Sequence, residues 1–374
     1  MKAGVDDVSP STSAQAVFTA LAGRTRATRP QLAADCGLSK PTVSAAVSEL
    51  EDIELVEHIG AAHGAIGRSA AIYRLGPAAG YALAVDRGST QVSFRAVALD
   101  GRPLDEGHTD MPPRARTMLR AALRRRSRSG PLRAIVVAVP EVVTPTGQAG
   151  DPDVDERVRA AVDSLGLPTT ATVSTENNVN CAAIAELREG VADGRNTFAY
   201  LQVGVGIGAG IVINGQLLRG MNGAAGELAR LAYPWTDDRA AGHEALEGRL
   251  GSAGLLRRAR ARWSTSDGPP PPDAVALFAL AGQGHPVAAM LVHEHAVEVG
   301  KLAASLAAVL DPGLVVLGGG VGANPLLTKG VVEMLAELSW PTDVVVSRLG
   351  DHATVLGAAQ LAREHAVRDA LVAR

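Results

Sequence analysis

The first part of the chain places apolar residues at helical spacing and then at strand spacing. Helical spacing predicts a helix over 14–21 and another that begins after Ser39. Between them, Thr28 is expected to cap a short helix that Gly37 ends in a tight turn. Two extended pieces then flank the glycine-bearing segment AAHGAIGRS. Helix, short helix, turn, helix and hairpin, in this order, predict a winged helix-turn-helix over 14–76.

The helix after Ser39 has an apolar face and a face of short polar side chains. Val43, Ala46, Val47 and Leu50 fall at helical spacing and predict the buried face. Short donors can approach base edges in the major groove, whereas an ordinary three-helix bundle with a hairpin, the alternative, would carry glutamate and lysine there. The expected DNA-contacting residues are Ser39, Lys40, Pro41, Thr42, Ser44 and Ser48, with Arg68 at the hairpin tip.

Local charge agrees with contacts to DNA phosphates. The segment 24–48 contains three arginines and Lys40 against the single carboxylate of Asp35, a net charge of +3 by this count. Cations of this kind neutralise phosphates in protein–DNA complexes. The net charge of the whole chain is −3, so it favours no partner class by itself.

A change of pattern at 76–80, Gly-Pro-Ala-Ala-Gly, predicts a short linker. Beyond it, strands and helices alternate to the end of the chain. Two stretches, YALAVDRGSTQVSFRAVALDG and TFAYLQVGVGIGAGIVINGQLL, each predict a pair of strands joined by a polar or glycine turn. Because each pair opens a similar series of elements, we expect an α/β protein with two similar lobes around a cleft.

Composition narrows the class of protein. The 374 residues are 47% hydrophobic but only 3% aromatic, so aliphatic side chains and glycine must fill the core. The two cysteines, Cys36 and Cys181, argue against a disulfide framework and a multi-cysteine zinc site. A polar tail is expected over 1–13, without the apolar region of a signal peptide, and no apolar run is long enough to span a membrane. We therefore expect a cytoplasmic protein.

The arginine-rich segment RARTMLRAALRRRSRS, residues 114–129, permits two interpretations. It could form a second nucleic-acid patch, or it could be an amphipathic helix with a solvated basic face. Met118, Leu119, Ala122 and Leu123 provide an apolar side, which favours the amphipathic helix.

Glycine-bearing turns follow predicted strands at three places. Glycine lets successive backbone N–H groups approach a phosphate and form an anion-binding concavity, although a glycine turn can equally serve packing. The middle turn is not a dinucleotide fingerprint, because a strand rather than a helix follows it. The candidate phosphate-turn residues are Asp86, Gly88 and Thr90; Gly204, Gly206 and Gly208; and Gly318, Gly319 and Gly320.

A resemblance to a known family rests on six motifs in order: AVDRGST, VVVAVP, TENNVN, VGVGIGAGIVINGQLLRGMNGAAGEL, LVVLGGGVG and LGDHATVLGAAQLA. The chain resembles the ROK family of repressors and sugar kinases, and GLSKPTVSAAVSELE with GRSAAIYRL is similar to the winged helix of its repressor branch. The resemblance implies an actin-like ATPase (ribonuclease H-like) ROK domain over 81–374. Its small lobe would cover about 81–175 plus 350–374, and its large lobe about 176–349.

Departures from the family pattern bear on catalysis. The kinases carry a general-base Asp where this chain has Asn178, and an amide cannot accept that proton; general-base catalysis contributes about 10²–10⁴-fold. Val205 replaces a threonine of the phosphate turn, Arg230 replaces a histidine that helps to hold sugar and zinc, and Glu141 replaces a glycine. The cysteines of the family's zinc site are absent from YPWTDDRAAGHEALEG. These departures from the family therefore imply no phosphoryl transfer, no metal and no cofactor.

Sugar binding is a separate question. Asn177 and Glu244 match the family's sugar contacts and Glu227 keeps its place, so the candidate ligand residues are Asn177, Asn178, Glu227, Arg230 and Glu244. Arg230 would favour an anionic ligand such as a sugar phosphate. Alternatively, these polar groups only satisfy one another in a closed cleft.

The sequence thus predicts a transcriptional regulator, expected to be a repressor. A homodimer or higher homo-oligomer would bind a pseudo-palindromic operator in double-stranded DNA. The ROK domain would supply dimerisation and the sensing of a sugar or sugar-derived effector. Two alternatives stay open: a sugar kinase with an appended DNA-binding domain, and a regulator whose ROK domain is only a dimerisation scaffold.

Overall fold

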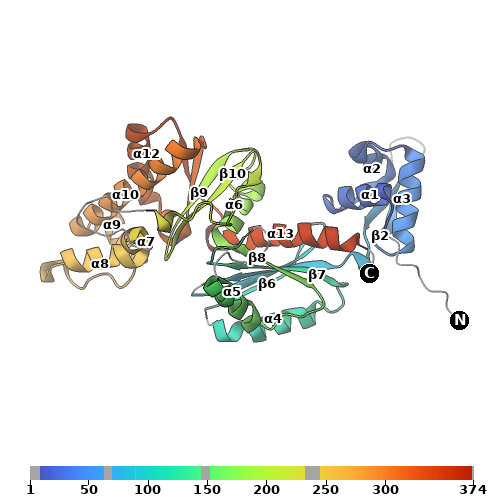
Figure 1. Ribbon diagram of the computed structural model, residues 1–374, viewed down its shortest axis with the longest axis horizontal. Coiled ribbons are helices and arrows are strands. Elements are labelled where there is room, and N and C mark those ends of the chain that lie inside the picture. Colours follow the sequence, from blue (N-terminus) through green and yellow to red (C-terminus); the bar gives the residue numbers. More distant parts are fainter. Residues whose placement is uncertain are drawn as a thin grey trace. The chain divides into compact units, whose positions relative to one another are not determined.

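The computed structural model describes residues 9–62, 70–88, 90–110, 112–144, 152–231 and 245–372. The chain forms two compact units (Figure 1). Unit 1 holds the N-terminal helices and one five-stranded sheet, and unit 2 holds a second five-stranded sheet. Unit 1 comprises Met1–Val139, Glu156–Glu176 and Ala358–Arg374; unit 2 comprises Pro140–Asp155 and Asn177–Gly357.

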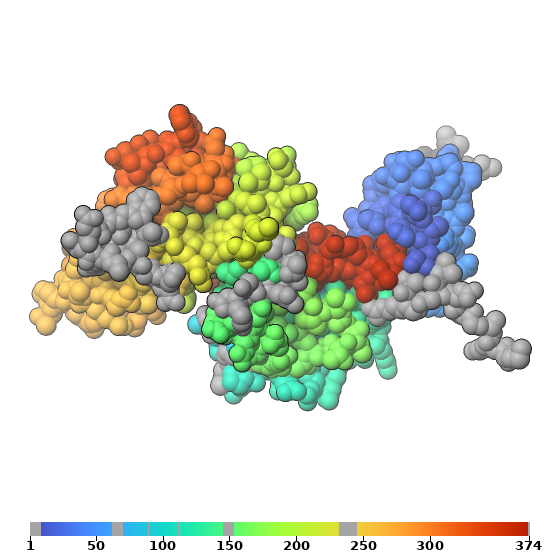
Figure 2. All heavy atoms as spheres, viewed as in Figure 1, coloured from blue at the N-terminus to red at the C-terminus, as the bar shows by residue number. Residues whose placement is uncertain are grey.

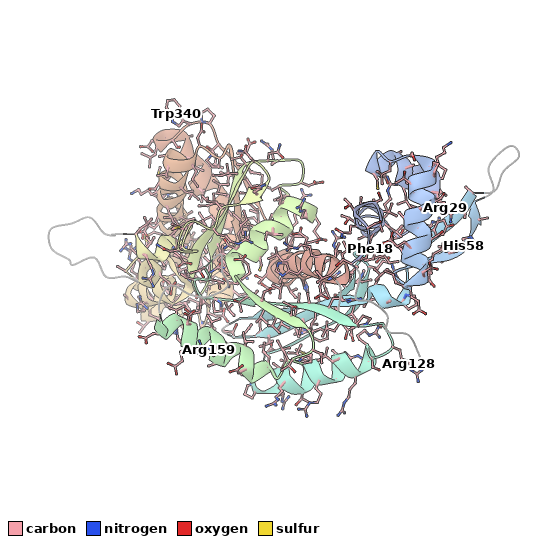
Figure 3. All side chains as sticks on the ribbon, turned by 45° about the vertical axis from the view of Figure 1, so that its right-hand side comes forward. Phe18, Arg29, His58, Arg128, Arg159 and Trp340 are labelled. Atoms are coloured by element: carbon pink, nitrogen blue, oxygen red, sulfur yellow. The ribbon has the colours of Figure 1, made fainter. Side chains whose placement is uncertain are left out.

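The N-terminal part of unit 1 is a winged helix-turn-helix. Three helices pack over a small antiparallel sheet of order β1-β3-β2, and Phe18, Leu32 and Leu50 are fully buried in its core. Figure 3 labels Phe18 in this core. The elements are α1 (Thr12–Ala22), β1 (Ala27–Thr28), α2 (Arg29–Cys36), α3 (Lys40–Asp52), β2 (Val56–Ala62) and β3 (Ala70–Leu75).

Local signals set the boundaries of these helices. Thr28 and Gln31 form a capping box at the start of α2, with the Thr28 N–H donating to Gln31 Oε1 at 2.8 Å. Gly37 ends α2 in the left-handed conformation at φ 63°. The Ser39 hydroxyl accepts from the Thr42 N–H at 3.3 Å and begins α3, whose predicted face of Val43, Ala46, Val47 and Leu50 is buried. The predicted fold of this domain is confirmed.

The second part of unit 1 is a mixed sheet of order β6-β5-β4-β7-β8. β4 pairs with β5 and β5 with β6 in antiparallel fashion, whereas β4 pairs with β7 in parallel. In Figure 1, α4 and α5 cover one face of this sheet and α13 covers the other. The elements are β4 (Tyr81–Arg87), β5 (Val92–Ala98), β6 (Pro103–Thr109), α4 (Pro112–Arg125), β7 (Leu132–Val139), α5 (Pro152–Leu165), β8 (Thr172–Asn177) and α13 (Ala353–Ala370).

Unit 2 repeats this plan in a sheet of order β11-β10-β9-β12-β13. Again two strands pair antiparallel on one side of a central strand, and parallel strands follow on its other side. The two similar lobes predicted from the sequence are therefore confirmed. The strands are β9 (Phe198–Val203), β10 (Ile207–Ile213), β11 (Gln216–Leu217), β12 (Leu314–Gly318) and β13 (Asp343–Val346); the helices are α6 (Asn178–Glu189), α7 (Ala245–Leu250), α8 (Ser252–Arg262), α9 (Ala274–Gly282), α10 (Pro286–Leu310), α11 (Gly319–Gly322) and α12 (Pro325–Leu338).

The predicted linker at 76–80 is an ordered junction. Pro77–Ala79 form a 3₁₀ turn, and Ala79 is only 2% exposed. The Gly76 N–H donates to the Leu55 carbonyl at 2.8 Å, and the Arg133 guanidinium donates to the Ala78 carbonyl at 2.6 Å. These contacts hold the winged helix-turn-helix to the sheet domain of unit 1, so this segment is not the free connection that its composition suggested.

Cys36 and Cys181 are both free thiols. No single helix in the described ranges has the length and apolarity of a membrane span; α9 and α10 reach these values only when taken together, and they are bent by 111° at the break between them.

A buried histidine makes the stability of unit 2 depend on pH. His295 on α10 is fully buried, and its Nδ1 accepts from Arg258 at 2.9 Å. Burial, with the Arg258 charge, lowers the pKa of His295 from 6.5 to about 4. The imidazole therefore becomes protonated near pH 6.5 in the unfolded chain but only near pH 4 in the folded chain. As the pH falls from 6.5 to about 4, the free energy of unfolding decreases by roughly 3 kcal/mol.

We expect His295→Gln to flatten this dependence, because the glutamine amide can still accept from Arg258 but does not titrate. Urea unfolding of wild type and variant at pH 7 and pH 4.5 measures the effect. The same loss of stability in both proteins would show that His295 does not cause it.

Candidate functional site

The exposed face of α3 is the candidate DNA-binding surface. Lys40, Pro41 and Ser48 are exposed, and Thr42 and Ser44 are half-buried. The Ser39 and Thr42 hydroxyls bond to each other at 2.8 Å while Ser39 caps the helix, so both have structural partners. Arg68, the predicted wing residue, lies outside the described residues.

Ion pairs neutralise three cations of this domain. Arg24 pairs with Asp35 at 2.9 Å, Arg29 with Glu51 at 3.9 Å, and Arg74 with Glu57. Arg29 also lies over the Tyr73 ring, 5.0 Å from its centroid. The stretch 14–76 contains six Lys or Arg and six Asp or Glu, so the winged helix-turn-helix is neutral by formal count. The net positive charge over 24–48 is therefore balanced by carboxylates elsewhere in the same domain.

The second candidate site lies at the start of α6 in unit 2. Asn177 is 7% exposed and caps α6: its Oδ1 accepts from the Val179 N–H at 2.8 Å and the Asn180 N–H at 3.2 Å. Its Nδ2 donates to the Glu141 carbonyl at 3.1 Å. Asn177 therefore fixes both the start of the helix and the segment after β7, a structural role that the sequence did not separate from ligand binding.

Asn178 has a different environment. It is half-buried in the first turn of α6, and its backbone carbonyl accepts from the Thr354 hydroxyl at 3.4 Å. In the described part of the chain its side-chain amide has no hydrogen-bond partner. Of the two adjacent asparagines, Asn178 is thus the one whose side chain can meet a ligand.

Glu227, another predicted ligand residue of unit 2, has a raised pKa. Burial raises the pKa of Glu227, the charge of Arg230 lowers it, and the charges of Glu141 and Glu247 raise it again. Arg230 itself is exposed, and Glu244 lies outside the described residues. Glu227, Glu141 and Glu247, which we call the carboxylate cluster, lie near one arginine, and the anionic ligand predicted from Arg230 stays a prediction. Carboxylates accept hydrogen bonds from hydroxyl groups, so this cluster suits a neutral polyhydroxylated ligand better.

Glu247 on α7 is a site residue that the sequence analysis missed. Its Oε2 accepts from the Ile207 N–H at 3.4 Å, and a Cβ added at Gly206 would lie 3.3 Å from the same oxygen. Glu247 thus joins the carboxylate cluster to the glycine turn between β9 and β10. The sequence contained one indication of this residue: Leu246 and Leu250 are spaced one helical turn apart, and both are buried. This spacing predicts α7 and places Glu247 beside its buried face.

The glycine turns of unit 2 are neighbours. A Cβ added at Gly204 would lie 3.5 Å from the Gly320 N, and one at Gly319 would lie 2.6 Å from the Val203 carbonyl oxygen. Gly319 has φ 79°, a conformation that L side chains rarely adopt. Val205, at the tip of the β9–β10 turn, is 64% exposed and offers no side-chain hydroxyl.

Two of the predicted turn glycines serve packing. Gly208 lies inside β10, where Val179 of α6 fills the space beside it. Gly318 ends β12, and the Tyr200 ring occupies the position of a side chain there. In unit 1, Asp86 is buried near the end of β4, Gly88 packs against the Gln91 carbonyl, and Thr90 is exposed.

The described residues contain no group of three or more His, Cys, Asp or Glu side chains that could hold a metal ion.

Sequence comparisons connect this chain to sugar kinases. The family profile described as "ROK family" matches residues 82–365. The bifunctional enzyme NanE/NanK of Brucella melitensis biotype 1 is 31% identical over 204 residues, which are 53% of this chain and 36% of that protein. The N-acetylmannosamine kinase of Salmonella arizonae is 34% identical over 202 residues, again 53% of this chain and 66% of that protein. The matched region thus spans about a third to two thirds of these relatives.

Among solved structures, the chain is also similar in fold to a transcriptional regulator. The crystal structure of a ROK family transcriptional regulator, a homolog of the E. coli MLC protein, has a TM-score of 0.72 and covers 96% of both chains at 20% identity, so the likeness is one of fold. The ROK family glucokinase from Streptomyces griseus, solved with glucose and AMPPNP, has a TM-score of 0.62 at 25% identity and covers 76% of this chain and 100% of its own.

Proposed function

The chain belongs to the ROK family, and from this premise we propose that it is a DNA-binding transcriptional regulator whose kinase-like domain binds a ligand without phosphorylating it. The observation that carries the proposal is the complete winged helix-turn-helix, with short polar side chains on the exposed face of α3. A sugar kinase needs no such domain. A regulator needs one, and the fold match over 96% of a ROK regulator supports this reading.

As a regulator, the protein would act in the cytoplasm as a homodimer on a two-fold symmetric operator, most simply as a repressor. A winged helix on each protomer would read one half-site, because operator symmetry mirrors the symmetry of the protein. Ligand binding would change operator affinity only as far as the ligand prefers one of two conformations.

Helix α13 has residues in both units. α13 packs on α6 near its start, where a Cβ added at Gly357 would overlap the Cys181 carbonyl oxygen. Further along, the Arg363 guanidinium donates to the Ala22 carbonyl at the end of α1, at 3.4 Å. The first of these contacts lies within unit 2 and the second within unit 1.

Genome-wide footprinting of the bound protein tests the proposal. We expect a set of discrete sites with a shared, pseudo-palindromic sequence, and the neighbouring genes would indicate the effector. Binding without any shared sequence would contradict the proposed function.

The ligand is expected to be a neutral sugar or sugar derivative. Titration calorimetry with a panel of neutral and phosphorylated sugars would show binding of a neutral one, and Glu227→Gln would weaken that binding by about tenfold, because one charged acceptor is lost. Glu333→Gln, an exposed carboxylate on α12, is the matched control. Tighter binding of the phosphorylated sugars would overturn this prediction.

Restoring the acidic residue at position 178 is not expected to create a kinase. Asn178→Asp supplies a general base, worth about 10²–10⁴-fold in an active enzyme, but Val205 still offers no side-chain hydroxyl to a nucleotide phosphate. A coupled assay with ATP and a sugar panel should therefore give the same background rate for wild type, Asn178→Asp and Asn178→Ala.

The rival function is a sugar kinase with an appended DNA-binding domain. The kinase relatives support it, and so does Glu247, which brings the carboxylate cluster next to the glycine turn. Turnover by the wild type well above background, with loss in Asn178→Ala, would establish this rival in place of the proposed function.

A further inference from the structure

Helix α4 of unit 1 has a basic face that the proposed function does not use. Its inner side, with Ala115, Leu119 and Ala122, is buried against the sheet, which confirms the predicted amphipathic helix. Its outer side is exposed; Figure 3 shows the long side chains of α4 pointing away from the sheet, and Figure 2 shows α4, in turquoise, at the outer surface of its unit. We call five exposed residues, four on α4 and one in the turn after it, the arginine row: Arg114, Arg116, Arg120, Arg124 and Arg128.

The arginine row has no counter-charges within the described residues. Asp105 pairs with Arg125 at 2.8 Å and with Arg126 at 3.9 Å. None of the five members of the row has an ion pair or a side-chain hydrogen bond in the described ranges. The sequence explains this, because 111–132 contains seven arginines and no acidic residue in a chain of net charge −3.

Such a row is unfavourable for the isolated helix. Arg116, Arg120 and Arg124 follow one another at i,i+4 spacing, where like charges repel. The spacing puts successive guanidinium groups about 6 Å apart along the helix axis, so the row presents a line of positive charge. A solvated helix face would ordinarily mix charges of both signs. The arrangement therefore suits an extended anionic partner.

The charge of the winged helix-turn-helix indicates which anionic partner the arginine row binds. It is neutral by formal count, three of its cations are paired, and among its described cations Arg26 and Lys40 have no ion-pair partner. Affinity for DNA comes largely from neutralised phosphates, so this domain alone would hold DNA weakly. The end of the arginine row is tied to the same domain: two residues beyond Arg128, a Cβ added at Gly130 would overlap the Pro77 carbonyl oxygen in the ordered junction.

We propose that the arginine row binds the phosphate backbone of DNA that flanks the site held by the winged helix. The inference rests on the proposed function and adds a second, sequence-independent contact surface to it. Phosphate contacts of this kind add affinity and orientation without reading bases.

The triple variant R116Q/R120Q/R124Q tests the proposal. Binding of full-length protein to a footprinted site in a 60-bp duplex is measured over a range of salt concentrations. Each phosphate contact contributes about −0.9 to the slope of log K against log salt, so the slope should become shallower by about 2–3 and affinity at 100 mM salt should fall at least about tenfold. The matched control R260Q/K301Q/K329Q removes three exposed cations from unit 2 and should leave both values unchanged.

The outcomes are distinguishable. If the wild type binds no specific site, the proposed function fails. If it binds specifically but the triple variant keeps the same affinity and slope, or the control variant loses as much, the role of the arginine row is wrong. Loss of binding to phosphatidylglycerol vesicles with unchanged DNA binding would assign the row to a membrane surface instead. A thermal melt excludes misfolding, since removing like charges should keep or raise the melting temperature.

Discussion

Glutamate at Ser44 and Ser48 is expected to abolish specific DNA binding while the winged helix-turn-helix stays folded. Ser48 is exposed and Ser44 half-buried, and both lie on the α3 face opposite its buried apolar residues. Each serine lost is a donor for base edges, where a good contact contributes about 1–3 kcal/mol, and each glutamate adds a negative charge beside phosphates. Affinity for a footprinted site should therefore fall at least about 100-fold, measured by fluorescence anisotropy.

A matched control separates this effect from net charge. Ala16→Glu with Thr19→Glu adds the same two charges at exposed positions of α1, and its affinity should stay within about threefold of wild type. Circular dichroism must show that both variants melt as the wild type does. If the α1 variant lost binding to the same extent, the assignment of α3 as the recognition helix would be wrong.

Local chemistry explains why the sequence predicted the winged helix-turn-helix well. Thr28, Gly37 and Ser39 interact with backbone groups only a few residues away. Their roles can therefore be predicted without knowledge of the tertiary structure. The hairpin that opens each sheet is equally local, since its two strands adjoin in sequence. The two-lobed fold followed from these pieces and from the order of the motifs.

The candidate sites depend on distant residues and were predicted less completely. Asn177 looked like a ligand contact because nothing in the sequence shows that the Glu141 carbonyl, 36 positions away, accepts from its amide. Glu247 meets Ile207 across 40 positions, and Arg24 meets Asp35 only after α1 and α2 have packed. The charge count over 24–48 therefore did not represent the whole winged helix-turn-helix, and the anionic ligand inferred from Arg230 stays a prediction.

Truncating Phe18 to alanine is expected to unfold the winged helix-turn-helix and leave the sheet of unit 2 intact. Phe18 on α1 is fully buried, and removing a buried phenylalanine ring costs about 3–5 kcal/mol. A domain of this size has little more stability than that to lose. The junction at Pro77–Ala79 and the bond from Arg363 to Ala22 are too few to replace the lost core.

Hydrogen exchange can localise the damage. In Phe18→Ala, amides of α1, α2 and α3 should lose protection while those of β9, β10 and β12 keep theirs, and DNA binding should disappear with the folded helix. Phe198→Ala makes the same change at a fully buried position of the unit 2 sheet and should give the reverse pattern. Equal loss of protection in all six elements of both variants would mean that the two units unfold together. An effector bound in unit 2 would then act on the winged helix-turn-helix through stability.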